Sequence, residues 1–502
     1  MARDVNITKF TTFWKVEKIP NVSFYKLTNS LSTEDFFTKE KIPYAYFEND
    51  TCYRFPLIPE EKLLGMFNID WLKPVISSVA PFPYKRTNRE ILMKNHPKDD
   101  VQKEVIEKAF KALTINKQNR VIISLKTGQG KTYVTTNLIA RLGIKTIIFV
   151  KSITLRDQWY DSFKRHTNLR DIMVVTRSQD LIDLLDTNEK ITPDVTIVVH
   201  RSMQNFIDAT SEKDLGRLFI KLGIGIKVYD EFDLENASMF RIDCNTAIRC
   251  NIYLSATDFK SGKTEDRIFK MIFHEAVNIG KEYDPKVQRN AKFILYNSHP
   301  SKVEFGRLYV YGPEGPIFSY PKFHEYVVKK KAYYNALVDL WDTFIKNRYY
   351  NEDNTLKTVF FIGRINTSEE FKKDLMDISG LSSKDISILN SETEKKWRPW
   401  AFSKKLIIST SDSLGRGVDL KGLDTVVDFE TRNSLSSTTQ VVGRVSRTGM
   451  KNVGTYIQFV DEGLPIPLKN YTTKLQSGFY NELFTKIEEE KWTNKETGEN
   501  TT

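Results

Sequence analysis

The nine residues Ser124-Leu-Lys-Thr-Gly-Gln-Gly-Lys-Thr132 decide the fold of this chain. They follow the apolar run Val121-Ile-Ile123 and precede a segment, 134–142, whose apolar residues recur with helical spacing. A strand, a glycine turn, a lysine, a hydroxyl and a helix, in that order, are what a nucleotide phosphate-binding loop requires. The sequence therefore predicts such a loop, although Leu125 stands where the strict pattern has its first glycine. The alternative is a surface turn that ends in Lys-Thr by chance.

Each residue type in the loop suits contact with phosphate. Gly128 and Gly130 would let backbone N–H groups approach phosphate oxygens without a Cβ in the way. Lys131 can reach the β- and γ-phosphates, and the Thr132 hydroxyl can ligate Mg²⁺. The predicted ATP contacts in this loop are Thr127, Gly128, Gln129, Gly130, Lys131 and Thr132.

Length and composition indicate a multidomain globular protein. At 502 residues the chain is long enough for about three domains, and 40% apolar with 28% charged residues is typical of a soluble protein. No stretch approaches the roughly 20 apolar residues of a membrane-spanning helix, and the N-terminus lacks the layout of a secretory signal. Three cysteines without metal-ligand spacing favour reduced thiols. We expect an intracellular protein with no membrane contact.

The net charge of +11 predicts a polyanionic partner or a generally basic surface. Charge alone does not distinguish DNA from RNA.

The order of apolar runs predicts an α/β fold with two doubly wound parallel-sheet domains and a smaller N-terminal domain. Residues 1–95 are aromatic-rich with short alternating stretches, so we expect an accessory domain, possibly DNA-binding, whose aromatics form a small core in preference to a base-stacking platform. Its basic connector, residues 84–89, is read as a solvated linker in preference to a phosphate contact. Five runs after the loop predict the strands of a domain over 96–280: 146–150, 172–175, 196–199, 224–229 and 252–254.

A second alternation of strands and helices follows a less regular stretch. Residues 281–345 are expected to connect the domains through a strand, a turn and a helix over 329–346. The second domain is predicted over 346–488, with strands at 358–362, 386–389, 406–409, 425–429 and 455–460. Residues 489–502 are expected to be a polar tail.

An acidic pair supplies the second element of a phosphate site. Val228-Tyr-Asp-Glu-Phe-Asp233 places Asp230 and Glu231 at the end of a predicted strand, about 100 residues after Lys131. Asp230 is positioned to hold Mg²⁺, and Glu231 to orient and deprotonate the attacking water. Taken alone, the pair could equally be a solvated turn.

The order of these elements resembles a superfamily 2 helicase or translocase over residues 96 to 465. The matching segments are Gln102, Thr127–Thr132 (motif I), Asp230–Asp233 (motif II), Leu254–Thr257 (motif III), Ser413–Asp419 (motif V) and Gln440–Gly449 (motif VI). The resemblance implies two tandem RecA-like domains, ATP and Mg²⁺ as cofactors, and nucleic-acid-dependent ATP hydrolysis.

The resemblance also implies roles for individual residues. Gln102 would read adenine, Gly415 and Asp419 would contact the nucleotide, and Ser255, Ala256 and Thr257 would couple the ATP site to nucleic-acid binding. Arg444 and Arg447, with Gln440, would reach the γ-phosphate across a cleft between the two domains. The three-residue spacing of the arginines independently places them on one face of a helix, although a basic face in salt bridges would look the same.

Nucleic-acid contacts are predicted where hydroxyls and basic residues follow strands. The candidates are Lys151, Ser152, Arg201, Ser202, Arg364, Thr410 and Ser411, each of which could instead be an ordinary polar loop residue. His200 is equally open between a structural histidine and a DNA contact.

Within the superfamily, Asp230–Asp233, Leu155-Arg-Asp-Gln-Trp159 and residues 258–270 are similar to the phage UvsW-type and RecG-like recombination helicases. This resemblance implies a DNA helicase that unwinds or migrates branched DNA in recombination, repair or replication. The compactness of the chain suggests a virus or phage protein, and we expect a monomer that acts in the host cytoplasm. An RNA helicase of the same superfamily stays open. So does an alternative of another class, a nucleic-acid-binding scaffold with a non-hydrolysing ATP site.

Overall fold

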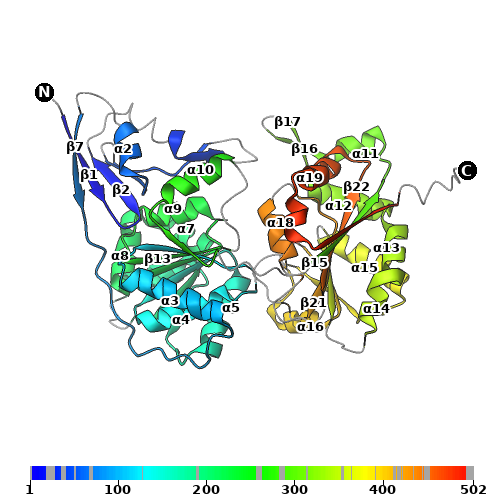
Figure 1. The fold of residues 1–502 in the computed structure, drawn as a ribbon, viewed down its shortest axis with the longest axis horizontal. Helices are drawn as coiled ribbons and strands as arrows, with labels where there is room; N and C mark the ends of the chain where they lie inside the picture. Colours follow the sequence, from blue (N-terminus) through cyan, green and yellow to red (C-terminus); the bar gives the residue numbers. More distant parts are fainter. Residues whose placement is uncertain are drawn as a thin grey trace, which may run out of the picture. The chain divides into compact units, whose positions relative to one another are not determined.

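The computed structural model divides into two compact units, Met1–Asp284 and Pro285–Thr502, and each is described by itself (Figure 1). It describes residues 3–17, 29–34, 41–49, 52–66, 72–126, 128–187, 192–233, 235–255, 263–281, 289–312, 315–351, 356–362, 365–390, 392–410, 414, 420, 422–432, 435–443, 445 and 453–492.

A parallel sheet of seven strands forms the centre of the first unit, in the order β10-β11-β9-β12-β13-β8-β14. Its strands are β8 (Arg120–Ser124), β9 (Thr146–Val150), β10 (Ile172–Val174), β11 (Val195–Val199), β12 (Ile226–Asp230), β13 (Cys250–Ser255) and β14 (Val277–Ile279). Successive side chains point to opposite faces, so Val121 and Ile123 enter one core while Ile122 enters the other. Because both faces are buried, these strands read as continuous apolar runs in the sequence.

Helices cover both faces of this sheet (Figure 1). One face carries α3 (Asp100–Thr114), α4 (Lys131–Leu142) and α5 (Ile153–His166). The other carries α6 (Ser178–Asp186), α7 (His200–Ala209), α8 (Glu212–Leu222), α9 (Asn236–Asp243) and α10 (Lys263–Ile272). This arrangement leaves the strand ends as the place where loops from several strands meet.

The N-terminal region forms a second sheet in the same unit, in the order β5-β6-β2-β1-β7. Its elements are β1 (Arg3–Lys9), β2 (Phe13–Glu17), β5 (Tyr46–Asn49), β6 (Cys52–Pro56) and β7 (Leu72–Ser78), with the ribbon β3 (Ser32–Glu34) and β4 (Lys41–Pro43) and helix α2 (Glu60–Met66). Trp14, Tyr53 and Phe55 are buried in it, so these aromatic side chains form a core, as expected. Thr12 Oγ1 donates to the Asp243 carbonyl at 2.9 Å, which joins this sheet to the end of α9.

The basic connector at 84–89 is packed, which corrects the expectation of a solvated linker. The Lys85 N–H donates to the Gly223 carbonyl at 2.9 Å, and the Thr87 N–H donates to the Gly143 carbonyl at 3.1 Å. Gly143 and Gly223 end α4 and α8 in left-handed conformations, with φ of 60° and 69°. The connector therefore crosses the edge where β9 and β12 begin, away from the phosphate-binding loop.

A second parallel sheet forms the centre of the second unit, in the order β19-β20-β18-β21-β22-β15-β23. Its strands are β15 (Arg289–Tyr296), β18 (Lys357–Phe361), β19 (Ile386–Leu389), β20 (Leu406–Ser409), β21 (Leu423–Asp428), β22 (Gly454–Asp461) and β23 (Lys486–Lys491). The two-stranded ribbon β16 (Tyr309–Gly312) and β17 (Gly315–Phe318) stands beside it.

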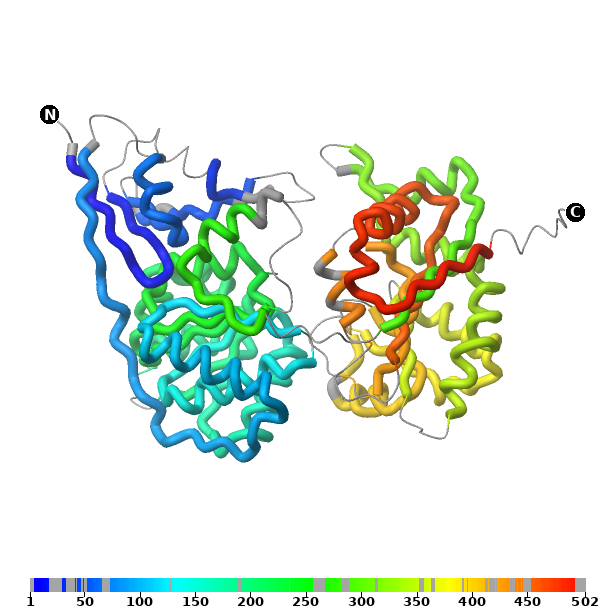
Figure 2. The backbone as a smooth tube through the Cα atoms, viewed as in Figure 1, coloured from blue at the N-terminus to red at the C-terminus, as the bar shows by residue number. Residues whose placement is uncertain are grey.

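Helices also cover both faces of the second sheet, as the tube in Figure 2 shows. One face carries α11 (Lys302–Arg307), α12 (Tyr320–Lys330), α13 (Tyr334–Leu340), the π-helical turn η1 (Trp341–Ile345), α14 (Lys346–Tyr349) and α15 (Ile365–Ser379). The other carries the short helix η2 (Lys395–Trp397), α16 (Arg398–Ser403), α18 (Leu435–Val442), α19 (Pro465–Gln476) and α20 (Phe479–Leu483).

The structure differs from the sequence-based boundaries at three places. The segment expected to connect the domains contributes β15 to the second sheet, because β15 pairs in parallel with β22. The polar tail expected from residue 489 overlaps β23, an edge strand that pairs with β15 through its backbone although its side chains are mostly charged. The helix expected over 329–346 is interrupted at Lys331, which has a left-handed φ of 52°.

The expected fold class is confirmed: two α/β domains with parallel sheets, accompanied by a small N-terminal sheet. Within the described part of the chain, no helix is both long and apolar enough to cross a membrane.

Candidate active site

The ends of three neighbouring strands bring the predicted ATP-site residues of the first unit together. In the parallel pairs, Ser124 of β8 lies opposite Ser255 of β13, and Asp230 of β12 lies opposite Leu254. The phosphate-binding loop, the acidic pair and Ser255 therefore share one edge of the sheet, as the carboxyl ends of parallel strands must.

The glycines of the loop have the backbone conformation that phosphate binding requires. Gly128 and Gly130 have φ of 85° and 86°, and α4 begins directly after them at Lys131. A Cβ on Gly130 would lie 2.3 Å from Gln102 Nε2, so a side chain there would displace the Gln102 amide and would also be strained by the positive φ. Leu125, in place of a first glycine, is 1% exposed and turns into the apolar core instead of towards the loop.

Gln102 lies at the start of α3 and is bonded to the loop. Its Nε2 donates to the Gln129 carbonyl at 3.0 Å, and its Oε1 accepts from the Lys98 N–H at 3.0 Å. Its own N–H is capped by Asp99 Oδ1 at 2.8 Å. The residue expected to read adenine thus also fixes the position of the loop.

Polar side chains of the loop form hydrogen bonds with the loop's own backbone. Lys131 Nζ donates to the Leu125 carbonyl at 2.8 Å, and Gln129 Oε1 accepts from the Lys126 N–H at 2.6 Å. Gln129 is 8% exposed, and its N–H donates to the Lys126 carbonyl at 3.1 Å, so both its side chain and its backbone shape the loop. Thr132 is half-buried in the first turn of α4.

Asp230 is a buried carboxylate with a specific partner. Its Oδ2 accepts a hydrogen bond from Trp159 Nε1 at 2.8 Å, and the residue is 7% exposed. Burial raises the pKa of the Asp230 carboxyl, while the Trp159 hydrogen bond and the charge of Lys131 oppose that rise. Glu231 follows with a φ of 53°, a left-handed conformation that is rare outside glycine and common at functional sites.

The sequence did not identify Trp159 as part of this site. Leu155, Trp159 and Phe163 recur every four residues on α5, and this spacing indicates only a buried face. The indole N–H reaches Asp230 because α5 packs across the sheet. No pattern in the sequence around Trp159 or Asp230 indicates that contact. Similarly, Ser255 Oγ donates to Asp233 Oδ1 at 3.3 Å, which links the motif II and motif III segments.

The residues present fit a nucleotide phosphate with Mg²⁺. The left-handed glycines expose backbone N–H groups, the N-terminus of α4 favours an anion, and Asp230 and Thr132 supply the oxygen ligands that Mg²⁺ prefers. Mg²⁺ bound there would neutralise phosphate charge.

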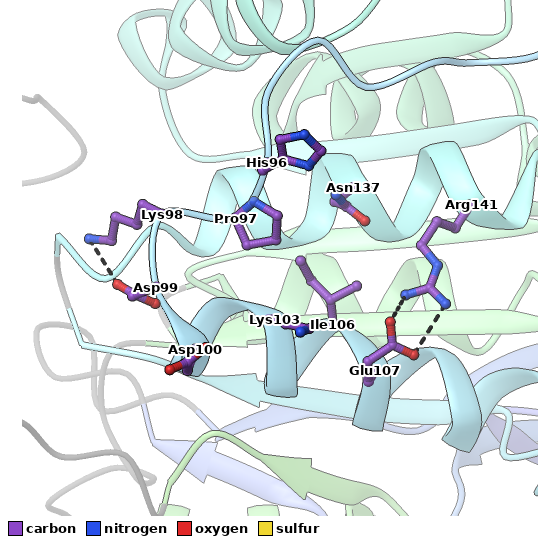
Figure 3. Close-up of a pocket in the computed structure, with 10 residues that line it drawn as sticks. All are labelled: His96, Pro97, Lys98, Asp99, Asp100, Lys103, Ile106, Glu107, Asn137 and Arg141. Atoms are coloured by element: carbon purple, nitrogen blue, oxygen red, sulfur yellow. Dashed lines mark hydrogen bonds and ion pairs between the residues drawn. The ribbon is translucent and has the colours of Figure 1, made fainter.

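A pocket of about 730 Å³ opens beside the start of α3 (Figure 3). It lies between the segment before α3, α3 itself and α4, and the Arg141–Glu107 ion pair, at 2.6 Å, lies along its wall. Its lining residues are His96, Pro97, Lys98, Asp99, Asp100, Lys103, Ile106, Glu107, Asn137 and Arg141. Lys98, Asp99 and Lys103 flank Gln102 in sequence, so the pocket adjoins the expected adenine-reading residue.

The predicted nucleic-acid contacts that the structure describes follow strand ends, as expected, and they differ in their exposure to solvent. Lys151 and Ser152 follow β9, Arg201 and Ser202 begin α7 after β11, and Thr410 follows β20. Arg201 is exposed, whereas Lys151, Ser202 and Thr410 are half-buried. Ser152 Oγ caps α5 by accepting a hydrogen bond from the Leu155 N–H at 3.3 Å, so this hydroxyl already has a partner within the fold.

The other predicted site residues fall on parts of the chain that are not described. Thr127, Ala256, Thr257, Arg364, Ser411, Gly415, Asp419, Arg444 and Arg447 lie outside the described residues. Gln440 lies in α18, which ends at Val442.

Two family models match this chain, one within each unit. The family described as "Type III restriction enzyme, res subunit" matches residues 95–257, and the family described as "Helicase conserved C-terminal domain" matches residues 338–449. This chain is a superfamily 2 helicase. Like other helicases, it is a nucleic-acid-dependent ATPase.

Viral proteins are among the relatives of this helicase. It is 22% identical to a "Transcript termination protein A18" of Yaba-like disease virus, over 76% of this chain and 77% of that protein. It is 25% identical to a "Putative helicase 161L" of Invertebrate iridescent virus 6, over 62% of this chain and 66% of that protein. A solved structure, S. cerevisiae Dbp5 bound to RNA and ADP BeF3, shares the fold at a TM-score of 0.50 and 16% identity, covering 78% of this chain and 90% of that one.

His200 of the helicase is a structural residue in the first unit. It is 2% exposed, its Nδ1 lies 2.8 Å from Ser238 Oγ, and its ring stacks on Tyr229 with centroids 5.9 Å apart. Burial lowers its pKa to about 3. Of the two open interpretations, the structure supports the structural histidine.

We expect this burial to make the first unit less stable as the pH falls from about 6.5 to 4.5. The unfolded chain takes up a proton at His200 near pH 6.5, and the folded chain only near pH 3, so between these values the unfolded state binds more protons. The loss approaches about 1.4 kcal/mol per pH unit for one such group. Urea unfolding at several pH values would measure it. The variant His200→Asn should show a shallower pH slope by that amount, and an identical slope would contradict the prediction.

Proposed function

We propose that this helicase is an ATP-driven motor that moves along or unwinds nucleic acid. The observation that carries the proposal is the arrangement at one edge of the first sheet, where the phosphate-binding loop follows β8 and the buried Asp230 carboxylate, which accepts a hydrogen bond from Trp159, ends β12. In this proposal Thr132 and Asp230 hold Mg²⁺, Lys131 binds the β- and γ-phosphates, and Glu231 takes a proton from the attacking water.

Residues of the second unit would complete the chemistry. We propose that Arg444 and Arg447 stabilise the charge on the γ-phosphate, with Gln440 beside them in motif VI and Gly415 and Asp419 of motif V at the nucleotide. Such arginines are worth roughly 10³–10⁵ in rate in related phosphoryl-transfer enzymes.

The base of ATP would lie against Gln102. The pocket beside α3 is lined by residues that flank Gln102 in sequence, and its polar lining suits a purine ring and its edge atoms. Binding of the base at Gln102 would then affect the position of the loop, since Gln102 Nε2 donates a hydrogen bond to the Gln129 carbonyl.

We propose DNA, single-stranded or branched, as the substrate, with unwinding or branch migration in recombination, repair or replication as the task. The support is the resemblance of Asp230–Asp233 and residues 258–270 to the UvsW-type and RecG-like helicases. The backbone contacts would be Lys151, Ser152, Arg201, Ser202, Arg364, Thr410 and Ser411, and Ser255, Ala256 and Thr257 would couple them to ATP. The net charge of +11 would add salt-sensitive, sequence-independent affinity.

RNA is the second candidate substrate. Two observations favour it: one viral relative is named for transcript termination, and the solved Dbp5 structure contains RNA. We further propose that the chain acts as a monomer and, since relatives are viral, in the cytoplasm of a host cell.

The test compares ATPase stimulation by an unpaired DNA strand, a branched DNA and an RNA strand of matched length. Strongest stimulation by branched DNA, with strand displacement, supports the first proposal, and preference for RNA supports the second. If none of the three stimulates hydrolysis while the protein binds them, the chain is a scaffold with a non-hydrolysing ATP site. Light scattering with and without nucleic acid measures the oligomeric state.

A further inference from the structure

Two tryptophans are exposed on the second unit, in the segment that joins β19 to β20. Trp397 is 55% exposed and Trp400 is 42% exposed. Tryptophan is mostly buried in folded proteins, because its large indole ring gains much from leaving water. Two exposed indoles three residues apart therefore call for a function at the surface.

Local geometry places both rings on one side of the same short helix. The turn η2 continues into α16 through Trp397, whose backbone is helical at φ −91° and ψ −13°. Residues three apart on a helix share a face, so Trp397 and Trp400 are neighbours. We call the surface formed by Trp397, Trp400, Lys396 and Lys404 the tryptophan patch.

The patch does not serve to attach the helix to its sheet. That attachment is made by Ala401, which is 1% exposed and whose carbonyl accepts from Ser387 Oγ at 3.0 Å. Phe402 packs on the apolar core from the same turn. The exposed parts of the two indoles are thus not needed to anchor the helix.

Cations accompany the rings. Lys396 Nζ lies 5.9 Å from the centroid of Trp397, and Lys404 Nζ lies 4.9 Å from that of Trp400. Residues 390–405 contain five lysine or arginine residues and two carboxylates, Glu392 and Glu394, which leaves a charge of +3. Glu394 pairs with Lys396 at 2.7 Å. A surface of flat aromatic faces with positive charge fits a partner that has both aromatic faces and negative charge.

The segment that carries the tryptophan patch leaves the sheet at the edge where nucleic-acid contacts are expected and returns at the opposite edge, where β20 begins. Leu389, the last residue of β19, lies opposite Ser409 of β20, which in turn lies opposite Phe361 of β18. Thr410, a proposed backbone contact, follows Ser409 at this same edge. The loop after Leu389 is fixed there, because Arg398 Nε donates to the Thr393 carbonyl at 3.3 Å and Thr393 Oγ1 accepts from the Asn390 N–H at 3.0 Å.

We propose that the tryptophan patch stacks on the bases of an unpaired nucleic-acid strand while Lys396 and Lys404 contact its phosphates. A duplex covers its base faces, so the patch selects an opened strand and tolerates any sequence. This inference rests on the proposed function, since it assigns a specific contact to the strand on which the motor acts.

The test measures binding of a DNA strand of about 16 nucleotides, the matching RNA strand and a DNA strand of equal length without bases. The double variant Trp397→Ala/Trp400→Ala should bind the two base-containing strands about tenfold more weakly per tryptophan, which corresponds to about 1.4 kcal/mol each. Its affinity for the strand without bases should equal that of the wild type. Trp397→Phe/Trp400→Phe, which keeps aromatic faces, should retain most of the affinity and shows that any loss is not a folding defect.

Salt dependence separates the two components of the patch. The tryptophan variants should keep the wild-type slope of log affinity against log salt, because stacking releases no counterions. Lys396→Ala/Lys404→Ala should lower that slope by about 0.7 for each phosphate that the variant no longer neutralises. Tyr311→Ala is the matched control. Tyr311 is 92% exposed on β16, in the ribbon whose aromatic side chains pack on the opposite face of the sheet from α16, so its removal should leave binding unchanged.

The experiment distinguishes failure of this inference from failure of the proposed function. If the wild type binds none of the strands, both the proposed function and this inference are wrong. If the wild type binds and the alanine variant binds equally well, the inference alone is wrong and the patch serves another contact, such as a protein. Equal losses for strands with and without bases would likewise overturn stacking. The DNA and RNA arms show which strand is preferred.

Discussion

Glu231→Gln should lower the ATP turnover of this helicase about 10³-fold, the effect typical of losing a general base, while ATP still binds. Glu231 directly follows Asp230 at the end of β12 and is held at a φ of 53°. Glutamine keeps the size of the side chain and can adopt the same backbone, but its amide does not accept a proton from water. The change therefore separates hydrolysis from nucleotide binding.

Steady-state hydrolysis with saturating nucleic acid measures turnover in this experiment, and a fluorescent ATP analogue measures affinity. Glu235→Gln is the matched control, since it makes the same chemical change four residues later at the start of α9. We expect it to retain wild-type turnover. A Glu231→Gln protein with more than about a tenth of wild-type turnover would rule out Glu231 as the general base.

Asp243→Ala should destabilise the first unit by about 3–5 kcal/mol, the typical cost of leaving a buried charge without its partner. Asp243 Oδ1 lies 2.5 Å from Lys227 Nζ, and Lys227 is 0% exposed. The same carboxylate accepts from the Tyr229 and Tyr253 hydroxyls, both at 2.7 Å. Burial lowers the pKa of Lys227, and the Asp243 charge opposes that shift.

Urea unfolding of the full chain measures this destabilisation, and a double variant provides the control. In Lys227→Met/Asp243→Leu both charges are replaced by apolar side chains, so the part of the loss that comes from the unpaired Lys227 charge should return, while the Tyr229 and Tyr253 hydroxyls still lack their acceptor. A cost below about 1 kcal/mol for Asp243→Ala would show that Lys227 does not depend on this carboxylate. Because Tyr229 precedes Asp230, a destabilised network should also reduce ATP binding.

Most strands of both sheets could be predicted from the sequence because they are buried on two faces, whereas the three-residue β14 was not predicted. Strands buried on two faces read as nearly continuous apolar runs, as in residues 147–150 and 406–408, and that pattern is visible without tertiary information. β23 was missed for the converse reason. It lies at the edge of its sheet, its backbone supplies the pairing with β15, and its sequence Lys-Ile-Glu-Glu-Glu-Lys has no apolar pattern.

The phosphate-binding loop and the acidic pair were likewise visible, because their chemistry needs particular residue types at a fixed spacing. The fold class, the loop at Gly128–Thr132, and Asp230 with Glu231 at a strand end all follow from the sequence alone. The folded chain was needed to show that Trp159 holds Asp230, that Gln102 fixes the loop, and that Asp243 joins two strands to α9. These contacts join residues 27, 71 and 10 positions apart along the chain through side chains whose types suit many roles, so only the packing of the helices on the sheet selects their partners.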